Sequence, residues 1–497
     1  MNYCDYLFSA REEWLDNPVL IDFHDDRSFT YRELQGMVQA LGNYLRKIGY
    51  RPGEVIATHL YNGAEAVIAH LAIQYAGCVS CLLDPLITAK GLPYYLQDSN
   101  AHCLITHLPK DKAEEHIAAD IQVIPVTDWH CLYERLPKNN NHEPAHNFKA
   151  DELAAIFYTS GTTSQPKGVM LCHKNFQAHY RIFDRVFGPY SMQDRLLCFV
   201  PFSHGYGSKS IFIPCLKSGA AVVMMRSFHP YKVLEAIEKY QITHLFGVPS
   251  HYQQLLRKAE LLPSLKKLKA AFSAAALLKP ETAREWYEQV GFYLDEGYGL
   301  IETCTGVAFR VGALPRRSGH IGTYPADLVQ IEILDDQDRV LTGEDRGEIA
   351  IRGDSVMLGY LNKEEETRRV LRKGWFRSGD MGYKTADNHI IMTGRIKDVI
   401  NVAGIKVAPF EIEAIINEHP AVVESAVIGI DDETYGEVVR GFVKLKPGAQ
   451  VDERDLKKFL QDRLINFQIP KEIVFIDDFP RNTMGKIDKK NLRHRLT

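Results

Sequence analysis

The sequence has no excess of positive charge. Its 59 lysines and arginines are outnumbered by 63 aspartates and glutamates, so the formal net charge at pH 7 is −4. A positive field is what holds a protein on nucleic acid or on an anionic membrane surface by charge alone. Because that field is absent, we expect no nucleic-acid partner.

A long hydrophobic run is also missing. The most apolar stretch, AVIAHLAIQYAG at residues 66–77, is interrupted by His70 and Gln74, whereas a membrane-spanning helix needs about 20 predominantly apolar residues. The N-terminal segment MNYCDYLFSAREEW has early acidic residues and lacks the apolar centre of a signal peptide. We therefore expect no membrane span and a cytoplasmic location.

The nine cysteines form no recognisable disulfide or zinc pattern. Their odd number and scattered positions argue against the disulfide framework of a secreted protein and favour a reducing compartment. The one close pair, Cys78 and Cys81, lies in the apolar run GCVSCLL, where free cysteines pack as small hydrophobic residues. No second CxxC and no spaced histidine pair completes a zinc site. We predict that Cys78 and Cys81 are buried thiols.

Helical and strand patterns alternate through most of the chain. Amphipathic residues 31–48 predict a helix, VIATHL after Gly53 predicts a strand, and the apolar helix that follows is expected to stop at Gly77. Short apolar runs recur at CLITHL, AAIFYT, RLLCFV, AAVVMM and THLFGV. This alternation predicts an α/β fold with parallel sheets covered by helices. The polar segment 137–147 is predicted to be a surface loop.

The pattern changes near residue 395. From there the order is strand, helix, two strands, helix and strand, and the first helix has Pro409 in its first turn, followed by Glu411 and Glu413. Proline and acidic residues both favour a helix start. The segment therefore has the composition and size of a small α+β domain. We predict a large domain at 1–395 and a small one at 396–497 that moves relative to it.

The most distinctive local pattern is YTSGTTSQPKG at residues 158–168. Backbone N–H groups and hydroxyls of such a loop can surround phosphate oxygens, and Lys167 adds a positive charge. An ordinary surface turn does not need four hydroxyl residues around one glycine. The segment is not a Walker A loop, which requires GxxxxGK[ST]. We predict a phosphate-binding loop of another kind.

Five further segments follow this loop. They are YGLIE (298–302), RSGD (377–380), GRIKDVI (394–400), VAGIKVAPFEIE (402–413) and PRNTMGK (480–486). In order and spacing, the six segments resemble the AMP-binding, adenylate-forming superfamily of acyl- and aryl-CoA synthetases, firefly luciferase and peptide-synthetase adenylation domains. The resemblance covers essentially the whole chain. It implies a large N-terminal domain of parallel-rich sheets, flanking helices and a β-barrel-like portion, with a small mobile α+β C-terminal domain.

The resemblance also implies a reaction in two steps. A carboxylate attacks the α-phosphate of ATP to give an acyl-adenylate and pyrophosphate, and a thiol then displaces AMP. Such a site must hold the triphosphate, neutralise charge and orient both reactants. By resemblance, Lys486 is the catalytic lysine, Glu302 is a catalytic residue and the magnesium ligand, and His204 gates the carboxylate site. The alternatives are a solvated glutamate for Glu302 and a hydrogen-bonded core histidine for His204.

Nucleotide binding is assigned by the same resemblance. Asp380 would accept hydrogen bonds from the ribose hydroxyls with help from Arg395, although a turn cap is an alternative for Asp380. Lys397 would be the hinge that swaps Lys486 out of the site. The remaining predicted ATP-binding residues are Thr159, Ser160, Gly161, Thr162, Thr163, Lys167, Ser273, Ala275, Ala276, Tyr298 and Gly299.

Two positions depart from the family pattern. Ile301 stands where the family has a threonine that hydrogen-bonds phosphate, and Ser164 replaces a glycine of the phosphate loop. Thr303 could take the place of the missing threonine only if the loop were shifted. Each departure could slow adenylation.

The segment PFSHGYG at residues 201–207 narrows the range of possible acid substrates. It resembles the segment that lines the acyl pocket in the family. Amino-acid-activating relatives place an aspartate near here, and this stretch has no acidic residue. Phe202, Tyr206 and Phe246 suggest an apolar pocket. We expect an aryl acid or a short- to medium-chain fatty acid.

No carrier sequence follows Lys486, so we expect a separate thiol acceptor. Coenzyme A is the first choice, and the phosphopantetheine of a separate acyl carrier protein is the alternative. A nucleotide-sensing binding protein is less favoured because Lys486, Glu302 and Asp380 are all present, and nothing in the sequence requires a luciferase-like oxygenase. The acid, the pathway and the choice between monomer and homodimer stay open.

Overall fold

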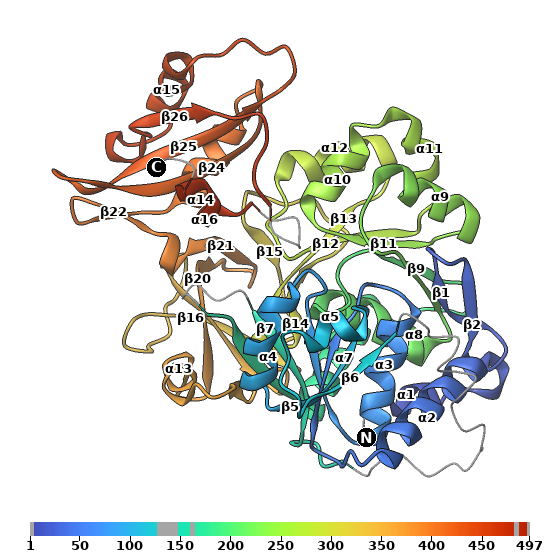
Figure 1. Cartoon of the computed structure of the whole chain (residues 1–497). Helices are drawn as coiled ribbons and strands as arrows, with labels where there is room; N and C mark the ends of the chain where they lie inside the picture. The colour runs from blue at the N-terminus through green and yellow to red at the C-terminus, as the bar shows by residue number, and fades with distance from the viewer. Residues whose placement is uncertain (1–3, 127–147, 160–164, 482–486, 495–497) are drawn as a thin grey trace.

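The structure is a computed structural model that describes residues 4–126, 148–159, 165–481 and 487–494. It contains four sheets, with the small C-terminal sheet set to one side of the other three (Figure 1). This arrangement confirms the predicted α/β class with a large N-terminal part and a smaller C-terminal part. Among the described residues, no helix combines the length and the apolar composition needed to cross a membrane.

The first sheet has eight strands and is parallel except at its two ends. In spatial order the strands are β14 (Thr305–Arg310), β13 (Leu294–Leu300), β12 (Ala270–Ala274), β11 (His244–Gly247), β9 (Arg195–Cys198), β10 (Ala221–Met224), β1 (Pro18–Asp22) and β2 (Arg27–Thr30).

The second sheet has seven strands; the last five in the order below pair in parallel, and the first two are joined by antiparallel pairing. Their order is β18 (Gly359–Tyr360), β8 (Lys167–Cys172), β7 (Leu153–Thr159), β4 (Val79–Leu83), β3 (Val55–His59), β5 (Ala101–Thr106) and β6 (Gln122–Pro125). Strand β4 is buried along its whole length, as expected for a parallel strand covered on both faces.

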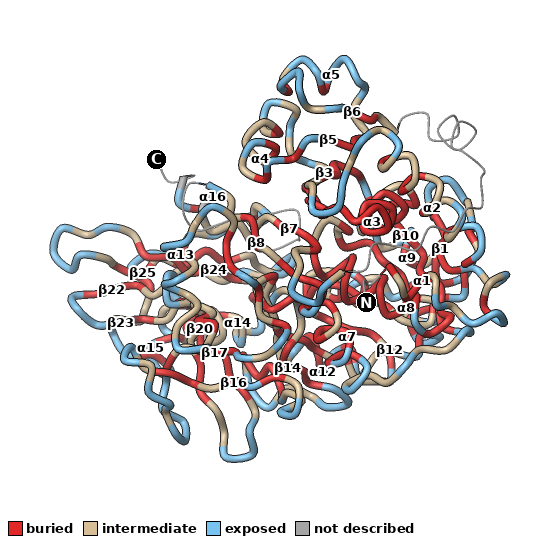
Figure 2. Tube along the Cα trace, turned by 90° about the horizontal axis from the view of Figure 1, so that it is seen from below, coloured by how far each residue is buried: buried red, intermediate tan, exposed pale blue. Residues whose placement is uncertain are grey.

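Helices cover both sheets, and α3 (Ala64–Ala76) lies in the interior, where Figure 2 shows it buried. All of its residues except Glu65 are buried, which explains its apolar composition. Gly77 ends it with a left-handed φ of 90°, a conformation that glycine adopts at little cost. Helix α2 (Tyr31–Lys47) starts with a capping box between Thr30 and Glu33. These bounds match the predicted helices.

The other helices of the large part are mostly short. They are α1 (Asp5–Phe8), α4 (Leu92–Asp98), α5 (Lys110–Glu114), α7 (His173–Phe187), α8 (Ile213–Ser218), α9 (Pro230–Tyr240), α10 (Pro249–Leu256), α11 (Leu262–Leu265), α12 (Pro280–Val290) and α13 (Glu364–Val370). A π-helix, η3 (Tyr206–Phe212), precedes α8. Four 3-10 turns complete this part: η1 (Glu12–Trp14), η2 (Ala89–Gly91), η4 (Ala259–Leu261) and η5 (Ile301–Thr303).

The third sheet is antiparallel and is the β-rich portion of the large part. Its strands are β15 (His320–Gly322), β21 (Ile390–Arg395), β20 (Trp375–Lys384), β17 (Gly347–Gly353) and β16 (Val329–Leu334), with β19 (Leu371–Arg372) paired to β20.

The fourth sheet follows η6 (Ile396–Asp398), which lies directly after the predicted boundary at residue 395. It contains β23 (Ile405–Val407), β22 (Ile400–Val402), β25 (Gly436–Leu445), β24 (Val422–Asp432) and β26 (Glu472–Phe475). Helices α14 (Pro409–Asn417), α15 (Glu453–Gln461) and α16 (Lys489–His494) and the turn η7 (Asn466–Gln468) complete this unit. It has hydrophobic clusters of its own, separate from the main core.

Candidate active site

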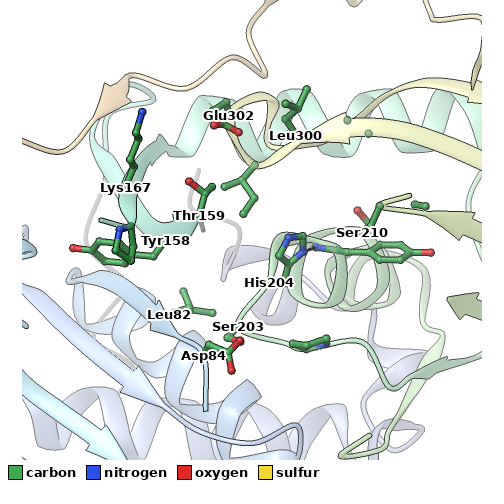
Figure 3. A pocket seen from close by; sticks show the side chains of 18 of the residues that line it. Leu82, Asp84, Tyr158, Thr159, Lys167, Ser203, His204, Ser210, Leu300 and Glu302 are labelled. Atoms are coloured by element: carbon green, nitrogen blue, oxygen red, sulfur yellow. Dashed lines mark hydrogen bonds between the residues drawn. The ribbon is translucent and has the colours of Figure 1, made fainter. Parts of the chain in front are cut away.

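One cavity of about 910 Å³ lies between the first three sheets and the start of the C-terminal part. Its lining comes from the ends of β4, β7, β12 and β13, from the β20–β21 pair, and from Lys397 and Arg481 of the C-terminal part. Ligands bind at the carboxyl ends of parallel strands because the loops there diverge. Figure 3 shows Thr159 and Lys167 on one side of this space, with His204 and Ser210 on the other.

The phosphate-binding side is framed by two strands. Thr159 ends β7 and Lys167 begins β8, and the two residues face each other in the antiparallel register. Both line the cavity. The predicted residues between them, Ser160, Gly161, Thr162 and Thr163, lie outside the described residues, as does Ser164. The strands thus place both ends of the predicted phosphate loop at the cavity.

Two residues of the β18–α13 segment, Tyr360 and Glu366, contact the charged side chains of Lys167 and Glu302 on this side of the cavity. The ammonium of Lys167 forms an ion pair with Glu366 and lies 5.1 Å from the centre of the Tyr360 ring. The hydroxyl of Tyr360 donates a hydrogen bond of 2.9 Å to Oε1 of Glu302. The sequence pattern did not reveal Tyr360 or Glu366, because each acts through a contact between distant segments.

Glu302 projects into the cavity from η5, directly after β13. Among the described residues, no three histidine, cysteine or acidic side chains gather as a metal site. A single carboxylate still fits Mg²⁺, which keeps several waters and takes other oxygens from phosphates. Thr303, the possible substitute for the missing threonine, is not part of the cavity lining. Its buried hydroxyl donates to the carbonyl of Leu300 and accepts from the Leu300 N–H, so it caps the turn.

On the side predicted to bind ribose, Asp380 is almost fully buried. Its Oδ2 accepts a hydrogen bond of 2.7 Å from the hydroxyl of Tyr298, and its Oδ1 accepts one of 2.9 Å from Nε of Arg395. Burial, and then the charge of Asp380, raise the pKa of Tyr298 well above its usual value. Tyr298 therefore stays protonated and acts as the donor of the hydrogen bond to Asp380. Tyr298 and Asp380 are absent from the cavity lining, whereas Gly299 and Arg395 are part of it.

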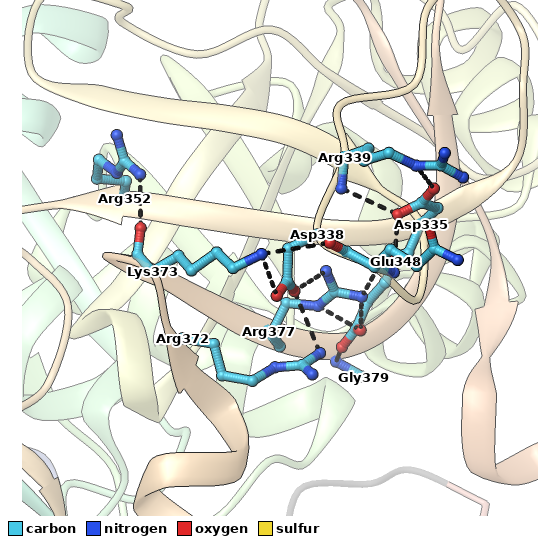
Figure 4. A network of polar contacts seen from close by, with 10 residues as sticks. Asp335, Asp338, Arg339, Glu348, Arg352, Arg372, Lys373, Arg377 and Gly379 are labelled. Carbon is cyan, nitrogen blue, oxygen red and sulfur yellow. Dashed lines mark hydrogen bonds and ion pairs between the residues drawn. The ribbon is translucent and has the colours of Figure 1, made fainter.

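A buried polar network fixes the RSGD segment in place (Figure 4). Arg377 donates 2.7 Å from Nε to Oε2 of Glu348 and 3.0 Å from Nη1 to Oδ1 of Asp338. The other carboxylate oxygen of Glu348 accepts from the N–H of Gly379 at 2.7 Å. Because a buried arginine needs such partners, this network determines where the backbone next to Asp380 lies.

Three further predicted ATP-binding residues, at positions 273, 275 and 276, lie only partly on the cavity wall. Ala275 lines the cavity and has a left-handed φ of 68°. Ser273 is fully buried, and its Oγ has no hydrogen-bond partner among the described residues. Ala276 is exposed and does not line the cavity. Of these predicted residues, the structure brings only Ala275 to the cavity.

The side of the cavity that is predicted to bind the acid substrate is aromatic. Phe183, Tyr206 and Phe272 line it, and the Tyr206 hydroxyl lies within 3.1 Å of the Gly247 carbonyl and 3.0 Å of the Phe272 carbonyl. These contacts fix the ring of Tyr206 as a wall. His204 also lines the cavity, and its Nδ1 accepts a hydrogen bond of 3.2 Å from the Tyr206 N–H.

The C-terminal unit reaches the same cavity. Lys397 lines it, and burial, followed by the charge of Arg395, lowers the pKa of Lys397. Arg481 also lines the cavity and forms an ion pair with Glu424, a contact that the sequence pattern did not indicate. Lys486, the predicted catalytic lysine, lies outside the described residues.

Comparison with known proteins identifies the family. The AMP-binding enzyme model matches residues 7–361, and the model of the AMP-binding enzyme C-terminal domain matches residues 411–486. A curated relative, 4-coumarate–CoA ligase 1 of Solanum tuberosum, is 32% identical over 513 aligned residues, which cover 99% of this chain and 93% of the relative.

Solved structures agree with this assignment. ATP-bound MatB from Rhodopseudomonas palustris is 29% identical with a TM-score of 0.92, covering 100% of this chain and 99% of that one. o-Succinylbenzoate CoA synthetase (MenE) from Bacillus subtilis, in complex with its acyl-adenylate intermediate, is 25% identical with a TM-score of 0.85, covering 99% and 98%. Because the first family model matches more than half of the sequence, this chain belongs to the family of AMP-binding, adenylate-forming enzymes.

Proposed function

We propose that this chain is an ATP-dependent acid–thiol ligase. It converts a carboxylic acid into an acyl-adenylate with release of pyrophosphate, and then transfers the acyl group to coenzyme A with release of AMP. The observation that carries the proposal is that five residues from three separate motifs, Thr159, Lys167, Glu302, Arg395 and Lys397, line one cavity. A site built this way can hold a triphosphate beside an acid pocket.

The similar proteins support coenzyme A as the acceptor. The curated relative is a 4-coumarate–CoA ligase, and MenE is a CoA synthetase whose structure contains an acyl-adenylate. ATP use is supported by membership in the family and by the likeness to ATP-bound MatB. Loading of a separate carrier protein uses the same first half-reaction, so the second half-reaction must distinguish the two acceptors.

The cavity wall favours an aryl acid or a short- to medium-chain fatty acid. Phe183, Tyr206 and Phe272 supply flat apolar surfaces, and aromatic rings gain from stacking or edge contacts with such walls. His204 lies beside them and can contact the acid carboxylate. The proposal therefore includes an apolar acid with its carboxylate near His204.

Residues of both the large and the C-terminal part are proposed to bind the nucleotide and to stabilise its negative charge. Lys167 would contact the outer phosphates, Glu302 would hold the Mg²⁺ that neutralises them, and Asp380 with Arg395 would hold the ribose. The role proposed for Lys486 is to stabilise the negative charge that develops on the α-phosphate and the acid carboxylate. The magnesium ion, when bound, supplies Lewis-acid polarisation of the phosphates.

Movement of the C-terminal unit about Lys397 would separate the two half-reactions. In the described residues, polar contacts between the two parts include the ion pair of Arg346 with Glu411 and a hydrogen bond of 3.3 Å from Nζ of Lys279 to the Val423 carbonyl. Polar contacts are typical of interfaces between domains that move relative to each other. We place the moving unit at residues 396–497 and the fixed domain at 1–395.

The experiment is acid-dependent exchange of labelled pyrophosphate into ATP, with a panel of aryl and fatty acids. At least one acid should support exchange, and adding coenzyme A should then give the corresponding acyl-CoA. Exchange followed by acyl transfer only to a phosphopantetheinylated carrier protein would replace coenzyme A as the acceptor. If no acid in a broad panel supports exchange, the proposed function is wrong.

A further inference from the structure

The cation predicted to bind the outer phosphates is already paired in the structure. The ammonium of Lys167 contacts the carboxylate of Glu366, and their side chains are only 17% and 30% exposed. Lys363 lies 3.8 Å from the other oxygen of Glu366. The hydrogen bond with Lys167 is the main cause of the lowered pKa of Glu366. The carboxylate therefore stays ionised at neutral pH and competes with any other anion for Lys167.

Glu366 is held in this place by the fold. Strand β18 pairs with β8, so that Gly359 faces Met170 and Tyr360 faces Val169. The N–H of Leu361 continues this pairing by donating to the Gly168 carbonyl at 2.8 Å.

The turn into α13 is fixed as well. Oγ1 of Thr367 accepts from the Tyr360 N–H at 2.9 Å and donates to the Lys363 carbonyl at 2.9 Å. Helix α13 is thus tied to β18, which pairs with the strand that carries Lys167. The contact between Glu366 and Lys167 follows from this backbone pairing.

A carboxylate in this place opposes phosphate binding in two ways. It occupies the ammonium that phosphate oxygens need, and it repels the phosphate charges from a short distance. Both effects are stronger where the groups are partly buried than in open solvent.

We propose that Glu366 is a positioning residue that holds Lys167 when no phosphate is bound and weakens the retention of pyrophosphate after the acyl-adenylate has formed. This inference rests on the proposed function, in which Lys167 contacts the outer phosphates of ATP. Pyrophosphate carries those same phosphates away. Return of Lys167 to Glu366 then assists its departure.

The test is titration calorimetry of the full-length chain with magnesium pyrophosphate, magnesium ATP and AMP. Glu366→Gln keeps the shape of the side chain and removes its charge. Glu365→Gln is the matched control, because Glu365 lies on the same helix and pairs with Arg369 in solvent. No acid substrate is needed.

Glu366→Gln should bind pyrophosphate and ATP about 2- to 5-fold more tightly than the wild type, the range expected for one partly exposed ion pair. Its affinity for AMP, which lacks the outer phosphates, should not change, and Glu365→Gln should match the wild type for all three ligands. In a Lys167→Met background, the gain in affinity for pyrophosphate and ATP from Glu366→Gln should shrink. The reason is that the Lys167 ammonium, which Glu366→Gln would otherwise release, is no longer present.

Unchanged or weaker pyrophosphate binding by Glu366→Gln overturns the inference, as does an equal gain for AMP or an undiminished gain in the Lys167→Met background. Failure of the wild type to bind ATP at all is a different result, because it contradicts the proposed function itself. A melting temperature equal to that of the wild type shows that a variant is folded.

Discussion

The hydroxyl of Tyr298 donates a hydrogen bond of 2.7 Å to the buried carboxylate of Asp380, across 82 residues of sequence. The bond joins the end of β13 in the first sheet to β20 in the third. With Arg395 on the other oxygen, it fixes the direction of the carboxylate. Each oxygen of a carboxylate can accept a second bond, so both oxygens of Asp380 keep acceptor capacity for the ribose hydroxyls that it is proposed to bind.

Tyr298→Phe should weaken ATP binding. Removing the hydroxyl leaves Oδ2 of Asp380 buried with one donor fewer, which costs about 1 to 3 kcal/mol and lets the carboxylate turn. We expect the dissociation constant of ATP to rise about 5- to 150-fold. Calorimetry measures this change, and Tyr287→Phe, at an exposed tyrosine, is the control. An unchanged ATP affinity would show that Asp380 is held without Tyr298.

Ala275→Gly should stabilise the fold. A φ of 68° at Ala275 places its Cβ in a crowded conformation, which costs about 1 to 2 kcal/mol for residues other than glycine. We expect the free energy of unfolding in urea to rise by about 1 kcal/mol. The neighbouring substitution Ala274→Gly in β12 should instead destabilise the fold, because glycine in a strand loses more conformational entropy on folding than alanine does. Equal effects at both positions would contradict the strain argument.

His179 should make stability depend on pH. Burial, followed by the charge of Lys209, lowers its pKa from 6.5 to about 3. Below about pH 6.5 the unfolded chain binds a proton that the folded protein excludes, so stability is present above this pH and is lost as the pH falls toward 3. Between pH 6.5 and about pH 5 the loss from this residue is about 2 kcal/mol.

Urea unfolding at these two pH values measures the loss. The drop should be smaller in His179→Asn than in the wild type and unchanged in His102→Asn, where the residue is exposed. If the drop in His179→Asn equalled that of the wild type, His179 would not be a source of the acid sensitivity.

Lys486→Ala should separate the two half-reactions. The lysine is proposed to stabilise charge during adenylation only, so pyrophosphate exchange should fall by about 100-fold or more. Thioester formation from supplied acyl-adenylate should fall far less. Lys489→Ala, which removes an ion pair with Glu413 in the same unit, is the matched control and should leave both steps nearly intact. Equal loss of both steps in Lys486→Ala would contradict the two-conformation proposal.

The order of elements could be predicted from the sequence because it rests on local periodicity. Helix α2 and the end of α3 at Gly77 follow from amphipathic spacing and from the left-handed preference of glycine. The prediction that Cys78 and Cys81 are buried thiols is confirmed, since both are free and buried. The loop at 137–147 lies outside the described residues, so its prediction stays untested.

The site was only partly predictable. Motif spacing indicated Lys167, Glu302 and Arg395, and all three line the cavity. It could not indicate that Thr303 caps Leu300 or that Tyr298 binds Asp380. These contacts depend on the direction in which a side chain leaves its strand or turn, and the motif pattern carries no such direction.

The family, the alternation of helices and strands, and the residue types available for holding a nucleotide could all be predicted from the sequence. All of these depend on neighbours along the chain or on motifs in a set order. Which charges meet depends on how the chain folds. Glu366 contacts Lys167 because β18 pairs with β8, and pairing between strands nearly 200 residues apart is set by packing of the whole fold rather than by any local pattern.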